Sequence, residues 1–118
     1  DVWYVNAHGT STHHNDLFET IAIKKTFGEH AKEMKINSTK SITGHLLGAA
    51  GAAEVITCVK ELQEDLIHQT VGYKVPDEQC DLDYVGNGNV KMDIKYALTN
   101  SLGFGGHNAS LLIKKYED

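Results

Sequence analysis

The sequence predicts an α/β domain in which helices are layered on a mixed sheet. Residues 2–5 and 96–102 are short apolar runs of the kind that form buried strands, and residues 46–64 hold a long helical pattern. The expected order is strand, helix, strand, helix, followed by an antiparallel pair. Such alternation of strands and helices is typical of layered α/β domains.

Composition limits the class of protein. The chain has 118 residues, 41% of them hydrophobic, which is one domain's worth and enough for a real core. A net charge of -5 without a cluster of Lys and Arg argues against nucleic acid as a partner. No apolar run reaches the roughly 18 residues of a membrane span, and no basic segment of a signal peptide opens the chain. Cys58 and Cys80 form no C-x-x-C pair, so the cytoplasm is the expected compartment.

The first half of the chain is expected to open with the strand at 2–5. A loop of small polar residues then carries His8, just beyond the carboxyl end of that strand, where α/β folds place their ligands. Asn15 or Asp16 is expected to cap a helix that ends at Gly28. A short strand over residues 34–36 should follow.

A Gly-, Ala- and Leu-rich segment is predicted to be a helix with Ser41 or Thr43 as its N-cap. Because no side chain from Leu46 to Ala53 is polar, we expect this helix to be buried on all sides. Beyond Glu54 the pattern becomes amphipathic. The apolar positions there are Val55, Ile56, Val59 and Leu62, and the polar ones are Lys60, Glu61 and Glu64.

Two polar residues of this segment need partners. A lone carboxylate in such a helix would be strongly penalised, so Glu54 is predicted to pair with Lys40. His45 is expected in the first helical turn, where the helix dipole would keep its ring neutral and able to donate a hydrogen bond. A core helix with one satisfied histidine and one ion pair would explain the same pattern without any function.

The rest of the chain reads as an irregular segment followed by a hairpin. Residues 72–89 contain the only proline and several turn-forming residues. Residues 96–102 are predicted to be a buried strand, residues 103–106 a turn, and residues 107–115 the returning antiparallel strand.

Four stretches resemble the C-terminal part of the β-ketoacyl-acyl-carrier-protein synthases, closest to the type II condensing enzymes of bacterial fatty-acid synthesis. They are Asn6–Thr12, Ser38–Gly51, Cys80–Tyr84 and Gly103–Asn108. The resemblance implies the C-terminal half of a thiolase-like fold, with residues 1–118 as a partial synthase domain. It also implies a decarboxylating Claisen condensation, in which a malonyl-derived enolate attacks an acyl group carried on a cysteine.

The resemblance also implies roles for individual residues. His8 and His45 match the two active-site histidines that donate hydrogen bonds to the malonyl thioester carbonyl, and Lys40 matches the active-site lysine. Preorganised N–H donors stabilise the oxyanion charge that develops in this chemistry. Thr10 and Thr12 match the hydroxyls that bind the pantetheine arm of the carrier.

Further positions match the acyl gate and a cation site of the family. Phe104 matches the gating phenylalanine, and Gly103, Gly105 and Gly106 give its loop room to move. The positions of a monovalent cation found in some members fall on Asn6, Glu19, Glu54 and Asn100. A buried hydrogen-bond network would explain these four residues equally well. No other cofactor is implied, because the substrate is carried on the phosphopantetheine of acyl carrier protein.

The nucleophilic cysteine of the family has no counterpart in this chain. Cys58 falls inside an apolar helix, which raises the pKa of a thiol, and Cys80 falls in a loop without an activating motif. The chain is therefore expected to be a fragment that is inactive alone. Its expected partners are acyl carrier protein, the N-terminal half of the synthase and, in the full enzyme, a second copy of it.

Two other interpretations stay open on the sequence. The chain could be a stand-alone, non-catalytic module that binds pantetheine or pairs with a separate cysteine-bearing chain. The adjacent His13 and His14 suggest a metal hydrolase, although no third histidine or spaced carboxylate accompanies them. His30 and His68 are expected on the surface, and His107 is expected to support the gating loop.

Overall fold

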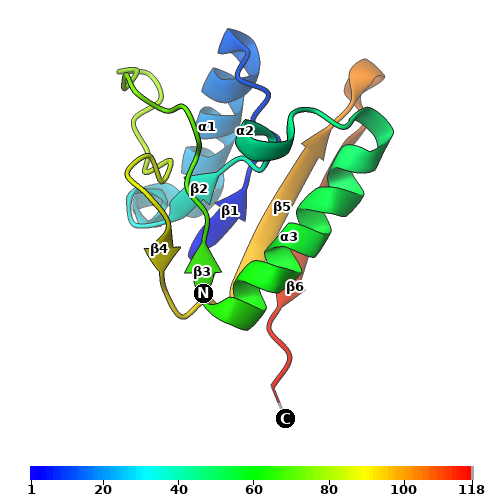
Figure 1. Ribbon diagram of the computed structural model, residues 1–118. Coiled ribbons are helices and arrows are strands. Elements are labelled where there is room, and N and C mark those ends of the chain that lie inside the picture. The colour runs from blue at the N-terminus through cyan, green and yellow to red at the C-terminus, as the bar shows by residue number, and fades with distance from the viewer. Residues whose placement is uncertain (118) are drawn as a thin grey trace.

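A computed structural model describes residues 1–117, and Figure 1 shows its helices and strands. The strands are β1 (Tyr4–Asn6), β2 (Lys35–Asn37), β3 (Leu66–Ile67), β4 (Val90–Lys91), β5 (Tyr96–Leu102) and β6 (Asn108–Lys114). The α-helices are α1 (His13–Phe27), α2 (Lys40–Thr43) and α3 (Ala50–Glu64). Short 3-10 turns cover Gly28–Lys32, Leu47–Ala49 and Phe104–Gly106.

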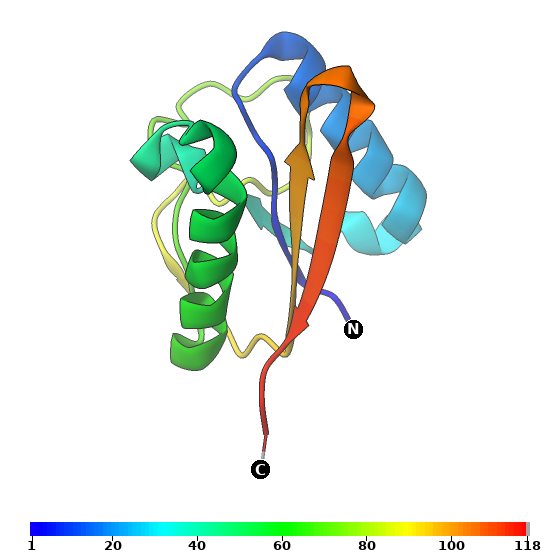
Figure 2. The ribbon, with the colours of Figure 1, turned by 90° about the vertical axis from the view of Figure 1, so that its right-hand side faces the viewer.

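The main sheet has the strand order β2-β1-β5-β6. Strand β1 is parallel to β2 and β5, whereas β5 and β6 are antiparallel, so the predicted mixed sheet with a C-terminal hairpin is confirmed. Helix α1 covers one face of the sheet and α3 the other (Figure 2). Because β1, β2 and β5 run in the same direction, the residues that follow them meet at one edge of the sheet.

The core lies in two clusters, one on each face of the sheet. Tyr4 and Val5 are neighbours on β1 whose side chains point to opposite faces, as the pleat of a strand requires. Tyr4 packs with Cys58 and Leu62 of α3, whereas Val5 packs in the other cluster with Ile23 of α1. The site at the sheet edge is therefore supported from both sides.

Helix α1 begins earlier than the sequence predicts. Its N-cap is Thr12, whose hydroxyl accepts the backbone N–H of Asn15 at 3.3 Å, so the prediction of Asn15 or Asp16 as the cap is wrong. The Asp16 side chain instead accepts the backbone N–H of Ser11 in the preceding loop, and the Asn15 side chain donates to Glu19 within α1. The predicted end at Gly28 is confirmed, and the positive φ of 60° there favours glycine.

The prediction of one helix buried on all sides around residues 46–53 is wrong. Helix α2 ends after four residues at Gly44, whose φ of 73° leaves the helical region. A 3-10 turn follows, and α3 begins only at Ala50 without a side-chain cap. Leu47 is 75% exposed, so a run of apolar residues does not by itself imply burial.

The second half of α3 also departs from the predicted pattern. Leu62 is buried as expected, but Ile56 is 63% exposed and Glu61 is buried. The reason is that Glu61 has hydrogen-bonding partners on β1 and just after β3, which make its burial possible.

The C-terminal part agrees closely with the sequence analysis. Residues 96–102 form β5 as predicted, and β6 begins one residue later and ends one residue earlier than the predicted strand. The small pair of β3 and β4 was missed because each strand has only two residues. Within residues 1–117, no helix combines the length and the apolar character that crossing a membrane requires.

Candidate active site

Two histidines and a lysine meet at the edge where the parallel strands end. The rings of His8 and His45 have their centroids 5.5 Å apart and are nearly perpendicular, at 85°. The Lys40 Nζ atom lies 3.4 Å from Nδ1 of His8. This proximity follows from the sheet, because Asn6 and Asn37 are in register on β1 and β2, a few residues before His8 and Lys40.

The hydrogen bonds of His8 define its tautomer. Its Nδ1 atom accepts the backbone N–H of Leu102 at 3.2 Å, so in the neutral ring the hydrogen is on Nε2. Burial, together with the positive charge of Lys40, lowers the pKa of His8 to about 4. Near neutral pH, His8 is therefore an uncharged ring with an Nε2–H donor.

His45 has the same tautomer as His8, but a different backbone N–H determines it. Its Nδ1 atom accepts the backbone N–H of Leu47 at 3.0 Å, which again leaves the hydrogen of the neutral ring on Nε2. The predicted position in a first helical turn is wrong, because His45 lies in the irregular link after Gly44. A backbone donor, rather than a helix dipole, therefore orients this ring.

The predicted ion pair between Lys40 and Glu54 is confirmed. The Lys40 ammonium lies 2.9 and 3.2 Å from the two carboxylate oxygens of Glu54. The two side chains are only 5% and 3% exposed, so each charge depends on the other for compensation. Lys40 is thus held by α3 on one side and placed against His8 on the other.

The loop that carries His8 is fixed by two residues. Glu19 of α1 accepts the backbone N–H groups of His8 at 2.8 Å and Gly9 at 3.1 Å. Gly9 has a φ of +50°, and a Cβ atom there would lie 2.5 Å from Cβ of Ser38. Ser38 also donates a hydrogen bond to the Gly9 carbonyl at 2.9 Å. The role of Ser38 was missed, because nothing in the sequence shows that the two loops touch.

The four residues matched to a cation site do not share one set of contacts. Asn100 donates to Glu19 at 3.4 Å, which agrees with a buried hydrogen-bond network. Glu54 is engaged by Lys40. The Asn6 amide donates to Thr39 at 2.7 Å, but its Oδ1 atom is buried and accepts no hydrogen bond from the described residues. Among the four residues, this is the one buried side-chain oxygen without a hydrogen-bond partner in residues 1–117, and such an oxygen could contact a hard cation.

The residues matched to substrate binding lie around the same edge. The hydroxyls of Thr10 and Thr12 are 3.0 Å apart, although Thr12 also caps α1. Phe104 is 100% exposed at the tip of the hairpin. The Gly103 N–H donates to the His107 carbonyl at 2.6 Å, and Gly105 has a φ of +79°. Phe104 therefore lies on a tight turn with little packing around its ring.

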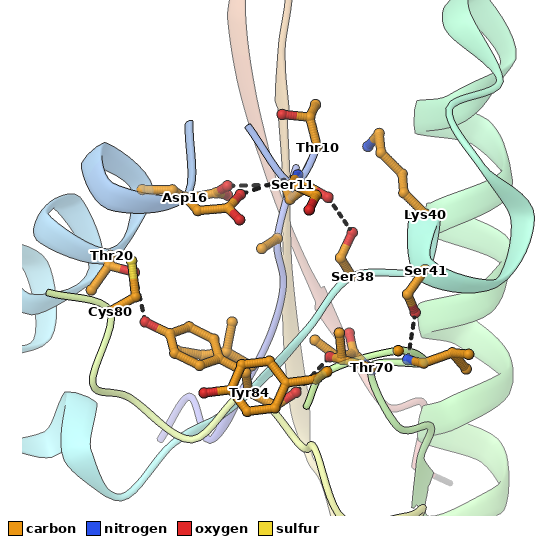
Figure 3. A pocket seen from close by; sticks show the side chains of 18 of the residues that line it. Thr10, Ser11, Asp16, Thr20, Ser38, Lys40, Ser41, Thr70, Cys80 and Tyr84 are labelled. Carbon is orange, nitrogen blue, oxygen red and sulfur yellow. Dashed lines mark hydrogen bonds between the residues drawn. The ribbon is translucent and has the colours of Figure 1, made fainter. Parts of the chain in front are cut away.

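A cavity of about 850 Å³ opens beside these residues. Lys40 and Ser41 line one side of it, and Asp16, Thr20 and Cys80 line the other (Figure 3). Thr20 and Tyr84, which the sequence analysis did not single out together, share a hydrogen bond of 2.7 Å in this wall. Burial raises the pKa of Tyr84 to about 12, so it lines the cavity as a neutral phenol.

The two cysteines lie in different surroundings. Cys58 is buried in α3, and this burial raises the pKa of its thiol to about 12. Cys80 is a free thiol on the cavity wall opposite Lys40. These positions agree with the interpretation that neither is an activated nucleophile.

The contacts of the remaining histidines suggest structural rather than catalytic roles. The rings of His13 and His14 are 5.6 Å apart on the exposed start of α1, and residues 1–117 contain no cluster of three His, Cys, Asp or Glu that could hold a metal. His30 and His68, which were predicted to lie on the surface, are half-buried. His30 contacts the Val2 carbonyl at 2.6 Å, and His68 contacts the Thr39 hydroxyl at 3.0 Å.

The sequence matches the family model of the beta-ketoacyl synthase C-terminal domain over residues 1–74. It is 55% identical over 117 residues to 3-oxoacyl-acyl-carrier-protein synthase 2 of Staphylococcus aureus (strain COL), covering 99% of this chain and 28% of that protein. The same-named protein of Synechocystis sp. is 49% identical over 116 residues, covering 98% of this chain and 28% of that protein.

Solved structures give the same result. A type II polyketide synthase acyl-carrier protein in complex with its ketosynthase bound to the hexaketide matches with a TM-score of 0.95 and 43% identity. A beta-ketoacyl synthase from Burkholderia phymatum STM815 matches with a TM-score of 0.91 and 37% identity. Each match covers 98% of this chain and 28% of the other.

The fold and these structural matches define a domain of the thiolase-like ketosynthase fold. The chain belongs to the β-ketoacyl synthase family, and it corresponds to the C-terminal domain of that family. It spans 28% of the length of the relatives described above.

Proposed function

We propose that this chain supplies the malonyl-binding part of the active site of a 3-oxoacyl-acyl-carrier-protein synthase that elongates fatty acids. The observation that carries the proposal is the pair of Nε2–H donors on His8 and His45, each with its Nδ1 atom held by a backbone N–H. Two oriented neutral donors suit an oxygen that gains negative charge during a reaction.

In this proposal the malonyl thioester oxygen accepts hydrogen bonds from both rings. Cleavage of the bond to the carboxylate releases carbon dioxide and leaves its electron pair as an enolate, whose oxyanion the two N–H groups stabilise. The enolate carbon then attacks an acyl thioester on a cysteine contributed by another part of the enzyme. A carbon–carbon bond forms, the carbon–sulfur bond breaks, and the cysteine leaves as the thiolate.

Lys40 acts on His8 rather than on the oxyanion. Its charge lies 3.4 Å from Nδ1 and opposes protonation of the ring, so His8 stays a donor through Nε2 alone. Glu54 in turn fixes the ammonium at that distance.

The substrate is proposed to arrive on the phosphopantetheine of acyl carrier protein. Thr10 and Thr12 would bind the pantetheine arm, and Phe104, on its exposed turn, would gate the acyl pocket. The polyketide ketosynthase neighbour is a complex with its acyl-carrier protein, which supports a similar partner here. The other partners are the N-terminal half of the synthase and a second copy of the complete enzyme. Without that half the chain would be inactive, because neither of its cysteines suits the nucleophile.

A monovalent cation and a cytoplasmic location complete the proposal. The buried Oδ1 atom of Asn6 supports the cation, whose part would be structural. The two free thiols are those expected in a reducing compartment.

The test is the condensation rate of the complete synthase that carries this domain. His8→Ala and His45→Ala should each lower kcat about 10²–10³-fold, the usual cost of losing one oxyanion donor. His14→Ala, an exposed histidine on α1, is the matched control and should leave kcat unchanged. Equal rates in all three variants would overturn the assigned roles.

A further inference from the structure

A second group of buried polar side chains lies beneath the active site, on the face of the sheet that α3 covers. Tyr4 of β1, Asn37 of β2 and Glu61 of α3 meet there. The Tyr4 hydroxyl oxygen is 2.7 Å from Oδ1 of Asn37 and also 2.7 Å from Oε1 of Glu61. Tyr4 is fully buried and Glu61 is only 6% exposed. The proposed function assigns no role to this group.

The orientation of the Asn37 amide is determined by its surroundings. Its Nδ2 atom lies 2.9 Å from the backbone carbonyl of His68, which can only accept a hydrogen bond. Nitrogen therefore faces His68, and Oδ1, an acceptor, faces Tyr4. The Asn37 side chain cannot supply a hydrogen to the tyrosine.

The hydrogens around Tyr4 can then be counted. A tyrosine hydroxyl carries one hydrogen, but two acceptor oxygens lie at hydrogen-bond distance. If Glu61 were ionised and took that hydrogen, the Tyr4 and Asn37 oxygens would face each other at 2.7 Å with no hydrogen between them. If Glu61 is protonated, Tyr4 donates to Asn37 and Glu61 donates to Tyr4, and every short contact has one hydrogen.

We propose that Glu61 is a neutral carboxylic acid in the folded protein, and that in this form it is a positioning residue that fastens α3 to β1 and β2 beneath His8 and Lys40. In addition, Asn6 donates to the same Tyr4 oxygen at 3.3 Å. The tyrosine oxygen thus accepts two hydrogens and donates one, which satisfies its full capacity.

The charges around Glu61 agree with this assignment. Burial raises the pKa of the Glu61 carboxyl, and the salt bridges of residues 1–117 do not include it. The titratable groups that face it are Tyr4 from β1, Cys58 on α3 and His68 after β3. Lys60 and Glu64 line a small adjoining cavity with it.

His68, the residue that follows β3, contacts its neighbours through both ring nitrogens. Its Nδ1 atom lies 2.7 Å from the Gln69 carbonyl and therefore donates. Its Nε2 atom lies 3.0 Å from the Thr39 hydroxyl, which also accepts a hydrogen bond from the Asn6 amide. Its hydrogen bond to Glu61 comes from the backbone N–H, 3.0 Å from Oε2, and the carbonyl oxygen of a neutral carboxylic acid can accept it.

The position of Glu61 on α3 explains what it can hold in place. Glu54 and Glu61 are seven residues apart, about two helical turns, and so lie on the same face of the helix. Glu54 contacts Lys40, and Glu61 contacts Asn37 three residues earlier. Helix α3 therefore contacts both ends of the segment from Asn37 to Lys40, and this segment places Lys40 against His8. This catalytic consequence rests on the proposed function, whereas the protonation of Glu61 does not.

The direct test is infrared spectroscopy of the complete protein with carbon-13 in its glutamate carboxyls. At pH 7 the wild type should show the carbonyl band of a protonated carboxylic acid, and Glu61→Gln should lose it. Glu64→Gln, three residues along α3 and exposed, is the matched control and should keep the band. A wild type without the band, or a band that survives in Glu61→Gln, would overturn the proposal.

Activity and thermal unfolding of the same variants test the positioning role. Glu61→Gln keeps an N–H donor for Tyr4 and should keep kcat, whereas Glu61→Leu removes the donor and should lower it. The stability that protonated Glu61 contributes to the fold is lost as pH rises from the ordinary glutamate pKa through its raised value. The melting temperature of the wild type should therefore fall relative to that of Glu61→Gln as pH rises. An unchanged kcat in a folded Glu61→Leu variant would overturn the positioning role. Full activity of His8→Ala would instead refute the proposed function and leave the infrared result intact.

Discussion

The Nδ1 atom of His8 accepts the backbone N–H of Leu102, a residue 94 positions later in the chain, at 3.2 Å. This bond joins the loop after β1 to the end of β5, the neighbouring parallel strand. It orients the ring and selects the tautomer with hydrogen on Nε2. The sheet therefore not only places His8 at its edge but also determines which nitrogen can donate.

The pH profile should reflect this environment. Since burial and Lys40 lower the pKa of His8 to about 4, condensation by the complete enzyme should not lose His8 as a neutral donor until pH approaches 4. The stability that the neutral ring contributes is present above the ordinary histidine pKa of about 6.5 and is lost as pH falls through about 4. NMR titration of the His8 ring checks this value, and a midpoint near 6.5 would contradict it.

Glu54→Gln should destabilise the protein. The change leaves the Lys40 ammonium buried without a countercharge, and breaking a buried pair in this way costs about 3–5 kcal/mol. Urea unfolding of the complete protein measures the loss. Glu64→Gln is the control on the same helix and should have little effect, because Glu64 is exposed. Equal stability of the two variants would contradict the importance of the pair.

Gly9→Ala should damage both folding and activity. The φ of +50° disfavours a side chain, and the added Cβ would lie 2.5 Å from Cβ of Ser38. Strain of this kind costs on the order of 1–3 kcal/mol. The double variant Gly9→Ala, Ser38→Gly should recover part of the loss because it removes the clash. Identical unfolding curves for wild type and Gly9→Ala would contradict the predicted clash.

The isolated chain should show no condensation of acyl and malonyl thioesters, because Cys58 is buried with a raised pKa and Cys80 lies in a loop without an activating sequence motif. A separately produced N-terminal part bearing the catalytic cysteine should restore turnover, whereas the same part with that cysteine changed to alanine should not. Turnover by the isolated chain would contradict the assignment of the nucleophile to another part of the enzyme.

Much of the fold followed from local sequence signals. The apolar runs, Gly28 and the glycine-rich turn after residue 102 predicted β1, the end of α1 and the C-terminal hairpin. The Lys40–Glu54 pair followed from the cost of leaving a carboxylate unpaired in an apolar helix. These features depend on residues close in sequence or on one strong energetic penalty.

Other features depended on contacts between distant residues and could not be predicted. The exposure of Leu47 depends on what packs against the turn before α3, and the burial of Glu61 depends on what packs against α3 itself. Periodicity does not contain that information. The tautomer of His8 depends on Leu102, and that of His45 depends on the break at Gly44. The residues of the site were suggested by resemblance, whereas their donor geometry came only from the structure.

The most direct measurement is the malonyl decarboxylation half-reaction of the complete enzyme, followed separately from acylation of its cysteine. If His8 and His45 are the two Nε2–H donors to the malonyl oxygen, His8→Ala and His45→Ala should each lower carbon dioxide release by about 10²–10³-fold while the cysteine is still acylated. Carbon dioxide release at the wild-type rate in either variant would contradict the account.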